Sequence, residues 1–156
     1  MSPLTRTCLS VVFLLSAAVS LAGPRALPSL ALADAAGAAA TETSLTQPSN
    51  WVLVVVDAER HLTVTVLPRL RRKEGDWAGK LVVVAAGSQA AFDRMVAQNA
   101  KLGGVRWYRD TSGQLLDRLA LSGTPVLLGM RPDNVIAWQI ATIPEAPEKA
   151  QAIVGS

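Results

Sequence analysis

The chain has 156 residues, a length that suits one domain with accessory segments, and its 15 Lys and Arg residues outnumber its 12 Asp and Glu residues by three. Two of these cations, Arg6 and Arg25, lie within the first 33 residues, which hold no acid, so thirteen cations face twelve acids in the remainder. That even balance excludes the basic surface of a nucleic-acid-binding protein, and we expect no nucleic-acid partner.

The first 33 residues have the layout of a cleavable export signal. Arg6 supplies the positive charge that precedes an apolar run from Cys8 to Ala22. This run is shorter than the ~20 residues that a membrane-spanning helix needs, and the helix-breaking pair Gly23-Pro24 follows it. We predict an exported protein, periplasmic or extracellular, with no stable membrane insertion after the signal is removed. An uncleaved amino-terminal anchor is the alternative.

Small residues at the spacing that signal-cleaving proteases require occur twice in this segment. The triplet Ala31-Leu32-Ala33 predicts a cut after Ala33, which makes residues 1–33 the signal peptide. The triplet Ser20-Leu21-Ala22 offers a second possible cut, after Ala22. Either cut removes Cys8, the single cysteine of the chain, so the mature protein has no thiol for a disulfide, for thiol exchange or for zinc binding.

Residues 34–50 consist mainly of Ala, Thr and Ser, with almost no large apolar side chain. Such a segment cannot bury enough surface to offset the entropy that it loses on ordering. We therefore predict a flexible linker over residues 34–50 and a folded domain over residues 51–156.

The first half of the predicted domain contains two strands and a helix. Continuous apolar runs over residues 51–56 and 81–85 predict strands that are covered on both faces. Gly87 and Ser88 provide a turn and a helix N-cap. A helix is predicted after them, since Phe92, Met95, Val96 and Asn99 recur at helical spacing before Gly103-Gly104.

The second half alternates short strands, turns and helices. A strand is predicted over residues 105–108, a turn over 110–113, and a short helix through the leucines that follow. Apolar strands over residues 125–130 and 135–140 flank turn-forming residues, which predicts a hairpin. A last helix is predicted over residues 145–153.

Residues 57–73 fit two different structures. Leu62, Val66 and Leu70 lie on one helical face, whereas residues 62–67 also alternate with period two. In the second interpretation, residues 62–67 form a strand that pairs with residues 51–56 in a hairpin. Local propensity and the awkward position of Pro68 in a helix favour the hairpin slightly.

Three stretches of the second half together resemble a known family. Residues 105–114 contain the turn Asp110-Thr-Ser-Gly113, residues 121–129 contain Gly123-Thr124-Pro125, and residues 131–142 follow as a hairpin. This order is similar to that of thioredoxin-like proteins, and most similar to the exported thiol–disulfide oxidoreductases of the TlpA type. The resemblance implies an α/β fold, a thioredoxin-like three-layer sandwich with a central mixed β-sheet. It also implies that Pro125 is cis and faces the active site, and that residues 60–73 form a helix kinked at Pro68.

The amino half departs from the family at its reactive motif. Where the family has C-x-x-C, this chain has His61-Leu62-Thr63-Val64. Dithiol exchange needs one attacking and one resolving thiol, so that reaction is excluded and no catalytic residue is assigned. We expect no cofactor and no metal, because one histidine and scattered carboxylates give no recognisable ligand spacing.

The preferred hypothesis is a non-catalytic domain that binds a protein partner, as an accessory to an envelope, secretion or conjugation assembly. In the resembled family, the segment before the cis proline pairs with an extended client peptide through backbone groups, and such pairing does not need the thiols. The expected binding residues are Glu59, Arg60 and His61 on one rim, and Gly123, Thr124 and Pro125 on the opposite edge.

Two alternatives come from other functional classes. The first is an enzyme with a non-thiol site around Asp57, Glu59 and His61, in which the imidazole and a carboxylate act as an acid–base pair. The second is a structural envelope domain whose groove has no role.

Overall fold

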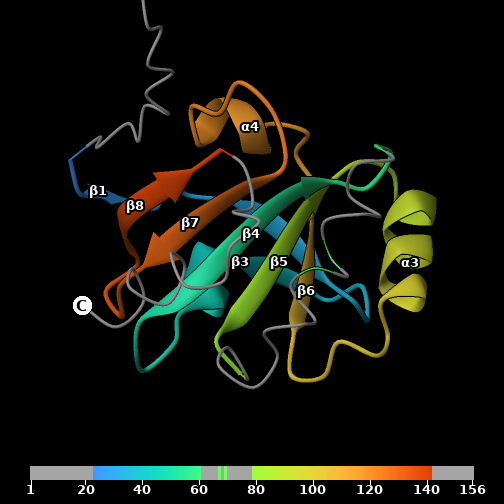
Figure 1. Cartoon of the computed structure of the whole chain (residues 1–156). Coiled ribbons are helices and arrows are strands. Elements are labelled where there is room, and N and C mark those ends of the chain that lie inside the picture. Colours follow the sequence, from blue (N-terminus) through green and yellow to red (C-terminus); the bar gives the residue numbers. More distant parts are fainter. Residues whose placement is uncertain (1–22, 61–66, 68, 70–78, 142–156) are drawn as a thin grey trace, which may run out of the picture.

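The computed structural model describes residues 23–60, 67, 69 and 79–141, and within these ranges eight strands form one sheet (Figure 1). The strands lie in the order β1-β8-β7-β4-β5-β6-β2-β3. The elements are β1 (Arg25–Ala26), β2 (Ala31–Asp34), β3 (Ala39–Thr41), the 3-10 helix η1 (Glu42–Leu45), β4 (Trp51–Asp57), β5 (Leu81–Ala86), α3 (Gln89–Gln98), β6 (Arg106–Asp110), α4 (Leu115–Arg118), β7 (Val126–Met130) and β8 (Val135–Ile140).

The sheet is mixed, as predicted. Strands β4, β5 and β6 run parallel, whereas β7 is antiparallel to β4 and β8 is antiparallel to β7. Parallel neighbours need a connection that crosses one face of the sheet, and α3 makes this connection between β5 and β6. The α/β class and the hairpin of β7 and β8 are therefore confirmed.

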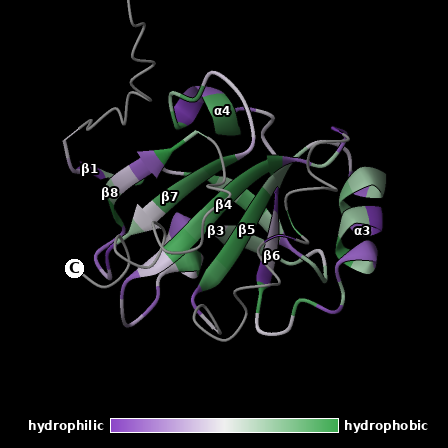
Figure 2. Cartoon of the chain, in the orientation of Figure 1, coloured by the Kyte–Doolittle hydropathy of each residue, from purple (hydrophilic) through white to green (hydrophobic). Residues whose placement is uncertain are grey.

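Burial of strand β4 on both faces of the sheet explains why its sequence is an unbroken apolar run. Leu53 and Val55 pack in a core cluster on one face of the sheet, and Val54 and Val56 pack in a second cluster on the other face. Figure 2 shows the hydrophobic colour continuing along the neighbouring central strands. A strand buried on both faces has no position where a polar side chain would meet water. It therefore lacks the alternation of apolar and polar residues that a strand with one solvated face shows.

Helical segments cover the two faces and complete three layers. Leu115 and Leu119, at α4, pack in the cluster that contains Leu53. On the opposite face, Phe92 and Met95 of α3 pack against the cluster that contains Val54. The α3 helix begins where predicted, because the Ser88 side chain accepts a hydrogen bond from the Ala91 N–H as an N-cap.

Of the two interpretations of residues 57–73, the hairpin of residues 62–67 with β4 is wrong. Both edges of β4 are occupied, since Val52–Asp57 pair with β5 and Trp51–Val55 pair with β7. Leu67 and Arg69 are helical, and the Leu67 side chain is fully buried in the cluster that contains Val54. The other residues from 61 to 73, and the last predicted helix over 145–153, lie outside the described residues.

The predicted linker is also wrong, because residues 34–50 include a strand, a 3-10 helix and a core side chain. Asp34 closes a turn by accepting hydrogen bonds from the N–H groups of Ala36 and Ala38, both at 2.9 Å. Gly37 provides the positive φ of 85° that this turn requires. The turn joins β2 to β3, and the Leu45 side chain that follows is 0% exposed. The small side chains of β3 suit a short edge strand. Its backbone hydrogen bonds to β2 order this segment, and composition alone cannot reveal that pairing.

The folded domain also begins earlier than Trp51. Strand β2 lies between β3 and β6, and the side chains of Leu27, Leu30 and Leu32 are buried in the core. Residues 25–33 therefore belong to the fold, and a signal peptide that reaches to Ala33 would remove part of the central sheet. Export and cleavage stay predictions.

Candidate functional site

The register of β4 and β7 brings the two predicted halves of the site to one end of the sheet. Val55 of β4 pairs with Val126 of β7, and the two strands are antiparallel. The residues that follow β4, Ala58 to Arg60, therefore emerge at the same end as Pro125, which precedes β7. Segments far apart in the sequence meet here because the chain reverses direction between these two strands.

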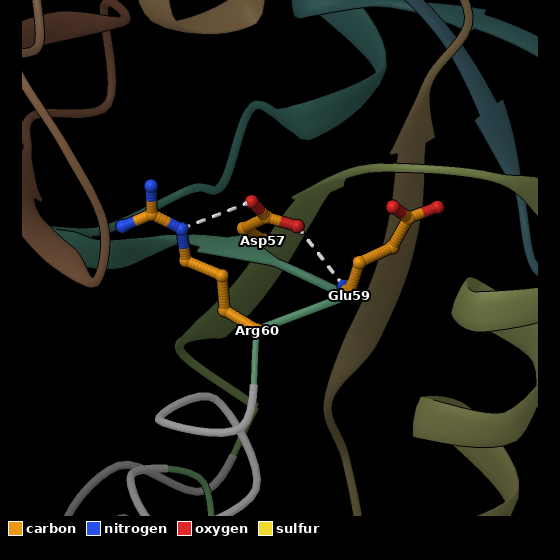
Figure 3. A network of polar contacts seen from close by, with 3 residues as sticks. All are labelled: Asp57, Glu59 and Arg60. Atoms are coloured by element: carbon orange, nitrogen blue, oxygen red, sulfur yellow. Dashed lines mark hydrogen bonds and ion pairs between the residues drawn. The ribbon is translucent and has the colours of Figure 1, made fainter.

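Asp57 organises the turn that follows β4 (Figure 3). Its Oδ1 atom accepts a hydrogen bond from the Glu59 N–H at 2.9 Å, and its Oδ2 atom lies 3.4 Å from Arg60 Nε. The Arg60 N–H donates to the Asp57 carbonyl oxygen at 3.1 Å. Figure 3 shows the Glu59 and Arg60 side chains pointing away from each other. The turn thus presents one acidic and one basic side chain on its two sides.

Glu59 connects this turn to helix α3. Its Oε1 atom accepts a hydrogen bond from the Ser88 N–H at 3.1 Å. Hydrogen bonds from the Ser88 backbone and side chain lower the pKa of the Glu59 carboxyl below its ordinary value, and the positive charge of Arg94 lowers it further. The same Ser88 caps α3, so Glu59 is a carboxylate at a helix N-terminus, where negative charge is stabilised.

The opposite edge, Gly123 to Pro125, presents accessible backbone. The three residues are half-buried, and the Thr124–Pro125 peptide bond is cis. No hydrogen bond joins the backbone of Ser122, Gly123 or Thr124 to another of the described residues. A Cβ atom added at Gly123 would meet nothing within 4 Å, so the space beside this backbone is open.

The two carboxylates of the alternative catalytic site both have structural partners. Asp57 and Glu59 hold the turn and the α3 N-terminus, and His61, the proposed acid–base partner, lies outside the described residues. Within residues 23–60, 67, 69 and 79–141, no three metal-ligating side chains are grouped to hold an ion. In the same ranges, no helix is long and apolar enough to cross a membrane.

Sequence reasoning missed two features of the surface. The local sequence predicts Ser88 only as a helix cap, because its hydrogen bond to Glu59 joins positions far apart in the chain that no local pattern connects. A shallow cavity of about 350 Å³ also lies at another edge of the sheet, where β2 and β3 meet the turn before α4. Leu30, Ala40, Thr111 and Arg118 are among its lining residues, and none of the predicted site residues lines it.

The fold has many counterparts among solved structures, although no protein-family model and no curated protein matches the chain. The thioredoxin domain of a thiol-disulfide oxidoreductase from Bacteroides vulgatus is 12% identical, with a TM-score of 0.69, over 86% of this chain and 99% of that one. A thiol:disulfide interchange protein from Bacteroides sp. is 12% identical, with a TM-score of 0.65, over 88% of this chain and 93% of that one.

A third counterpart is a secreted Mycobacterium tuberculosis disulfide oxidoreductase homologous to E. coli DsbE. It is 16% identical, with a TM-score of 0.57, over 83% of this chain and 92% of that one. Identities this low show the fold alone, and the fold is the thioredoxin-like α/β fold of thiol–disulfide oxidoreductases, here in a chain with one cysteine.

Proposed function

We propose that this chain is an exported, non-catalytic thioredoxin-like domain that binds an extended segment of a protein partner along Gly123 and Thr124. The observation that carries the proposal is the free backbone of Ser122, Gly123 and Thr124, which bonds to none of the described residues and borders open space. This backbone lies at the end of the sheet where the turn after β4 also emerges.

Backbone pairing with an extended peptide gives affinity without any reactive group. An unpaired stretch of N–H and C=O groups beside a sheet can accept another strand, and side chains at the rim then select the partner. Glu59, Arg60 and His61 are the proposed rim, with opposite charges on Glu59 and Arg60. Because Glu59 also binds Ser88, we expect Arg60 to contribute more to partner selection than Glu59 does.

The non-catalytic part of the proposal follows from sulfur chemistry. Exchange within one chain requires a thiolate to attack and a second thiol to resolve the mixed disulfide. The chain has Cys8 alone, upstream of the folded domain, so it cannot supply this pair. The export part is supported by Arg6 and the apolar run that follows it. We further propose that the exported domain is an accessory to an envelope, secretion or conjugation assembly.

A photo-crosslinking residue at Gly123 tests the binding proposal. The open space around Gly123 accommodates a larger side chain, and exposed Ala97 on α3 is a matched control position. In the producing cell, we expect a defined protein adduct from position 123 and none from position 97. Adding Thr124→Arg should remove the adduct, because the long cationic side chain blocks the edge.

Other outcomes favour the alternatives. Equal adducts from both positions, or an adduct that survives Thr124→Arg, would indicate a structural domain whose groove is unused. A His61→Ala variant should leave an adduct detectable if the domain binds protein, because pairing with the backbone of Gly123 and Thr124 does not need this rim side chain. Loss of a measurable turnover in that variant would instead favour the enzyme.

A further inference from the structure

We propose that the export signal is cut between Ala22 and Gly23, and not after Ala33. The inference rests on the proposal that the chain is exported. The catalyst would be an endoprotease of the export pathway that requires small residues at the first and third positions before the bond, which Ala22 and Ser20 provide. Water adds across the peptide bond, leaving a carboxylate on Ala22 and an amine on Gly23.

The first argument concerns strand pairing, because a cut after Ala33 would remove β1 and most of β2. In the structure, Leu32 pairs with Asp110 of β6 on one side and with Ala40 of β3 on the other. Without β2, strand β3 has no neighbour in the sheet and β6 becomes an open edge. Unpaired strand edges promote aggregation, so the shortened product would be both less stable and less soluble.

The second argument concerns the core. Leu27, Leu30 and Leu32 are 8%, 3% and 2% exposed, and they pack in the same cluster as Leu53 and Tyr108. A cut after Ala33 would remove all three leucines and expose one face of the central sheet to water. A cut after Ala22 keeps all of them.

The third argument sets the upstream limit of the mature chain. Arg25 Nη2 donates to the Leu119 carbonyl oxygen at 2.7 Å and to Gln139 Oε1 at 3.2 Å. The Leu27 N–H donates to the Asn134 carbonyl oxygen at 2.8 Å. Arg25 and Leu27 therefore belong to the folded domain, and Ser20-Leu21-Ala22 is the nearest triplet upstream of them with small residues at both required positions.

Matched substitutions in the full-length chain distinguish the two cuts. Ser20→Gln places a bulky residue at the third position before the Ala22–Gly23 bond, and Ala31→Gln does the same for the bond after Ala33. Ala31 is exposed, so its substitution should not disturb the core. The chain is produced in a bacterium with a general secretory pathway, and the exported protein is measured by intact mass and amino-terminal sequencing.

We expect an exported protein that begins at Gly23, loss of processing in Ser20→Gln, and unchanged processing in Ala31→Gln. An exported protein that begins at Asp34, or one whose processing is lost in Ala31→Gln, would overturn the cleavage site while leaving export intact. A chain that keeps Met1 and stays inside the cell would overturn the export proposal as well.

Discussion

Glu59 and Ser88 are 29 residues apart in the sequence, yet the Glu59 carboxylate accepts a hydrogen bond from the Ser88 N–H at 3.1 Å. This bond fixes the turn after β4 to the N-terminus of α3. The Glu59 rim of the proposed groove is therefore held against helix α3 by a hydrogen bond. This bond does not require the C-x-x-C motif of the resembled family.

The Glu59–Ser88 bond predicts a specific dependence of stability on pH. The hydrogen bonds from Ser88 hold the pKa of the Glu59 carboxyl below its ordinary value in the folded state, so the ionised form stabilises the fold at neutral pH. This contribution is lost as the pH falls through the lowered folded-state value. Glu59→Gln should therefore have a lower Tm than the unchanged protein at neutral pH, with the difference disappearing in acid. A difference in Tm that stays constant between neutral and acidic pH would contradict this assignment.

Leu45→Ala tests whether the segment before β4 belongs to the core. The Leu45 side chain is completely buried among residues of the central sheet. Truncation of a buried leucine lowers the free energy of unfolding by about 2–5 kcal/mol. Thr43→Ala, at an exposed position of the same 3-10 helix, is the control and should change it little. Chemical denaturation measures the free energy of unfolding of both variants. A Leu45→Ala variant as stable as the unchanged protein would restore the linker interpretation.

Asp110 should be more important for stability than its small size suggests. Its buried carboxylate accepts hydrogen bonds from the Leu115 N–H at 2.9 Å and from the Ser112 N–H and hydroxyl at 2.9 and 2.7 Å. Asp110→Ala leaves these donors unsatisfied, which costs roughly 1–3 kcal/mol of the free energy of unfolding. Asp117→Ala, an exposed change within α4, should be close to neutral in the same urea titration. An Asp110→Ala variant of unchanged stability would show that the network contributes nothing.

Gly129 is required by its neighbour Trp138 on the adjacent strand. The two residues pair in the β7–β8 ladder, and a Cβ atom at position 129 would overlap the indole ring. Gly129→Ala should lower the free energy of unfolding by about 1–3 kcal/mol through overpacking. In the double variant with Trp138→Leu, part of this loss should be absent, because the ring that clashes is gone. Strictly additive losses in a double-mutant cycle would contradict the clash.

Much of the sheet could be predicted from local patterns. The apolar runs of β4 and β5 and the hairpin of β7 and β8 stand out because burial on both faces, or a polar turn between two strands, leaves a clear signal. The helix α3 was predictable from its Ser88 cap and from the spacing of Phe92 and Met95. These features depend on short stretches of sequence alone.

The errors arose where long-range pairing decides the structure. The alternation of residues 62–67 favours a strand, but it cannot show that β5 and β7 already occupy both edges of β4. The composition of residues 34–50 predicts a linker, because it cannot show that β2 and β3 pair. The Asp34-Ala-Ala-Gly37 turn of this segment follows the same D-x-x-G pattern that identified the turn at Asp110, and that signal could have predicted the β2–β3 hairpin.

The candidate site was only partly accessible to sequence reasoning. Only a family resemblance points to Gly123, Thr124 and Pro125, and the register of β4 and β7 brings them to the same end of the sheet as the turn after β4. The bond from Ser88 to Glu59 was not expected, since it joins two loops through their three-dimensional positions. That bond gives Glu59 a structural role in addition to its proposed role at the rim.

Amide hydrogen exchange at Gly123 and Thr124 tests the binding proposal most directly, measured with and without the partner captured from position 123. In the free protein these amides bond to none of the described residues, so we expect fast exchange. Partner binding should slow their exchange by about tenfold or more, while the amide of Asp133 in the exposed β7–β8 turn stays unchanged. Unchanged exchange at Gly123 and Thr124 in a saturated complex would contradict backbone pairing at this edge.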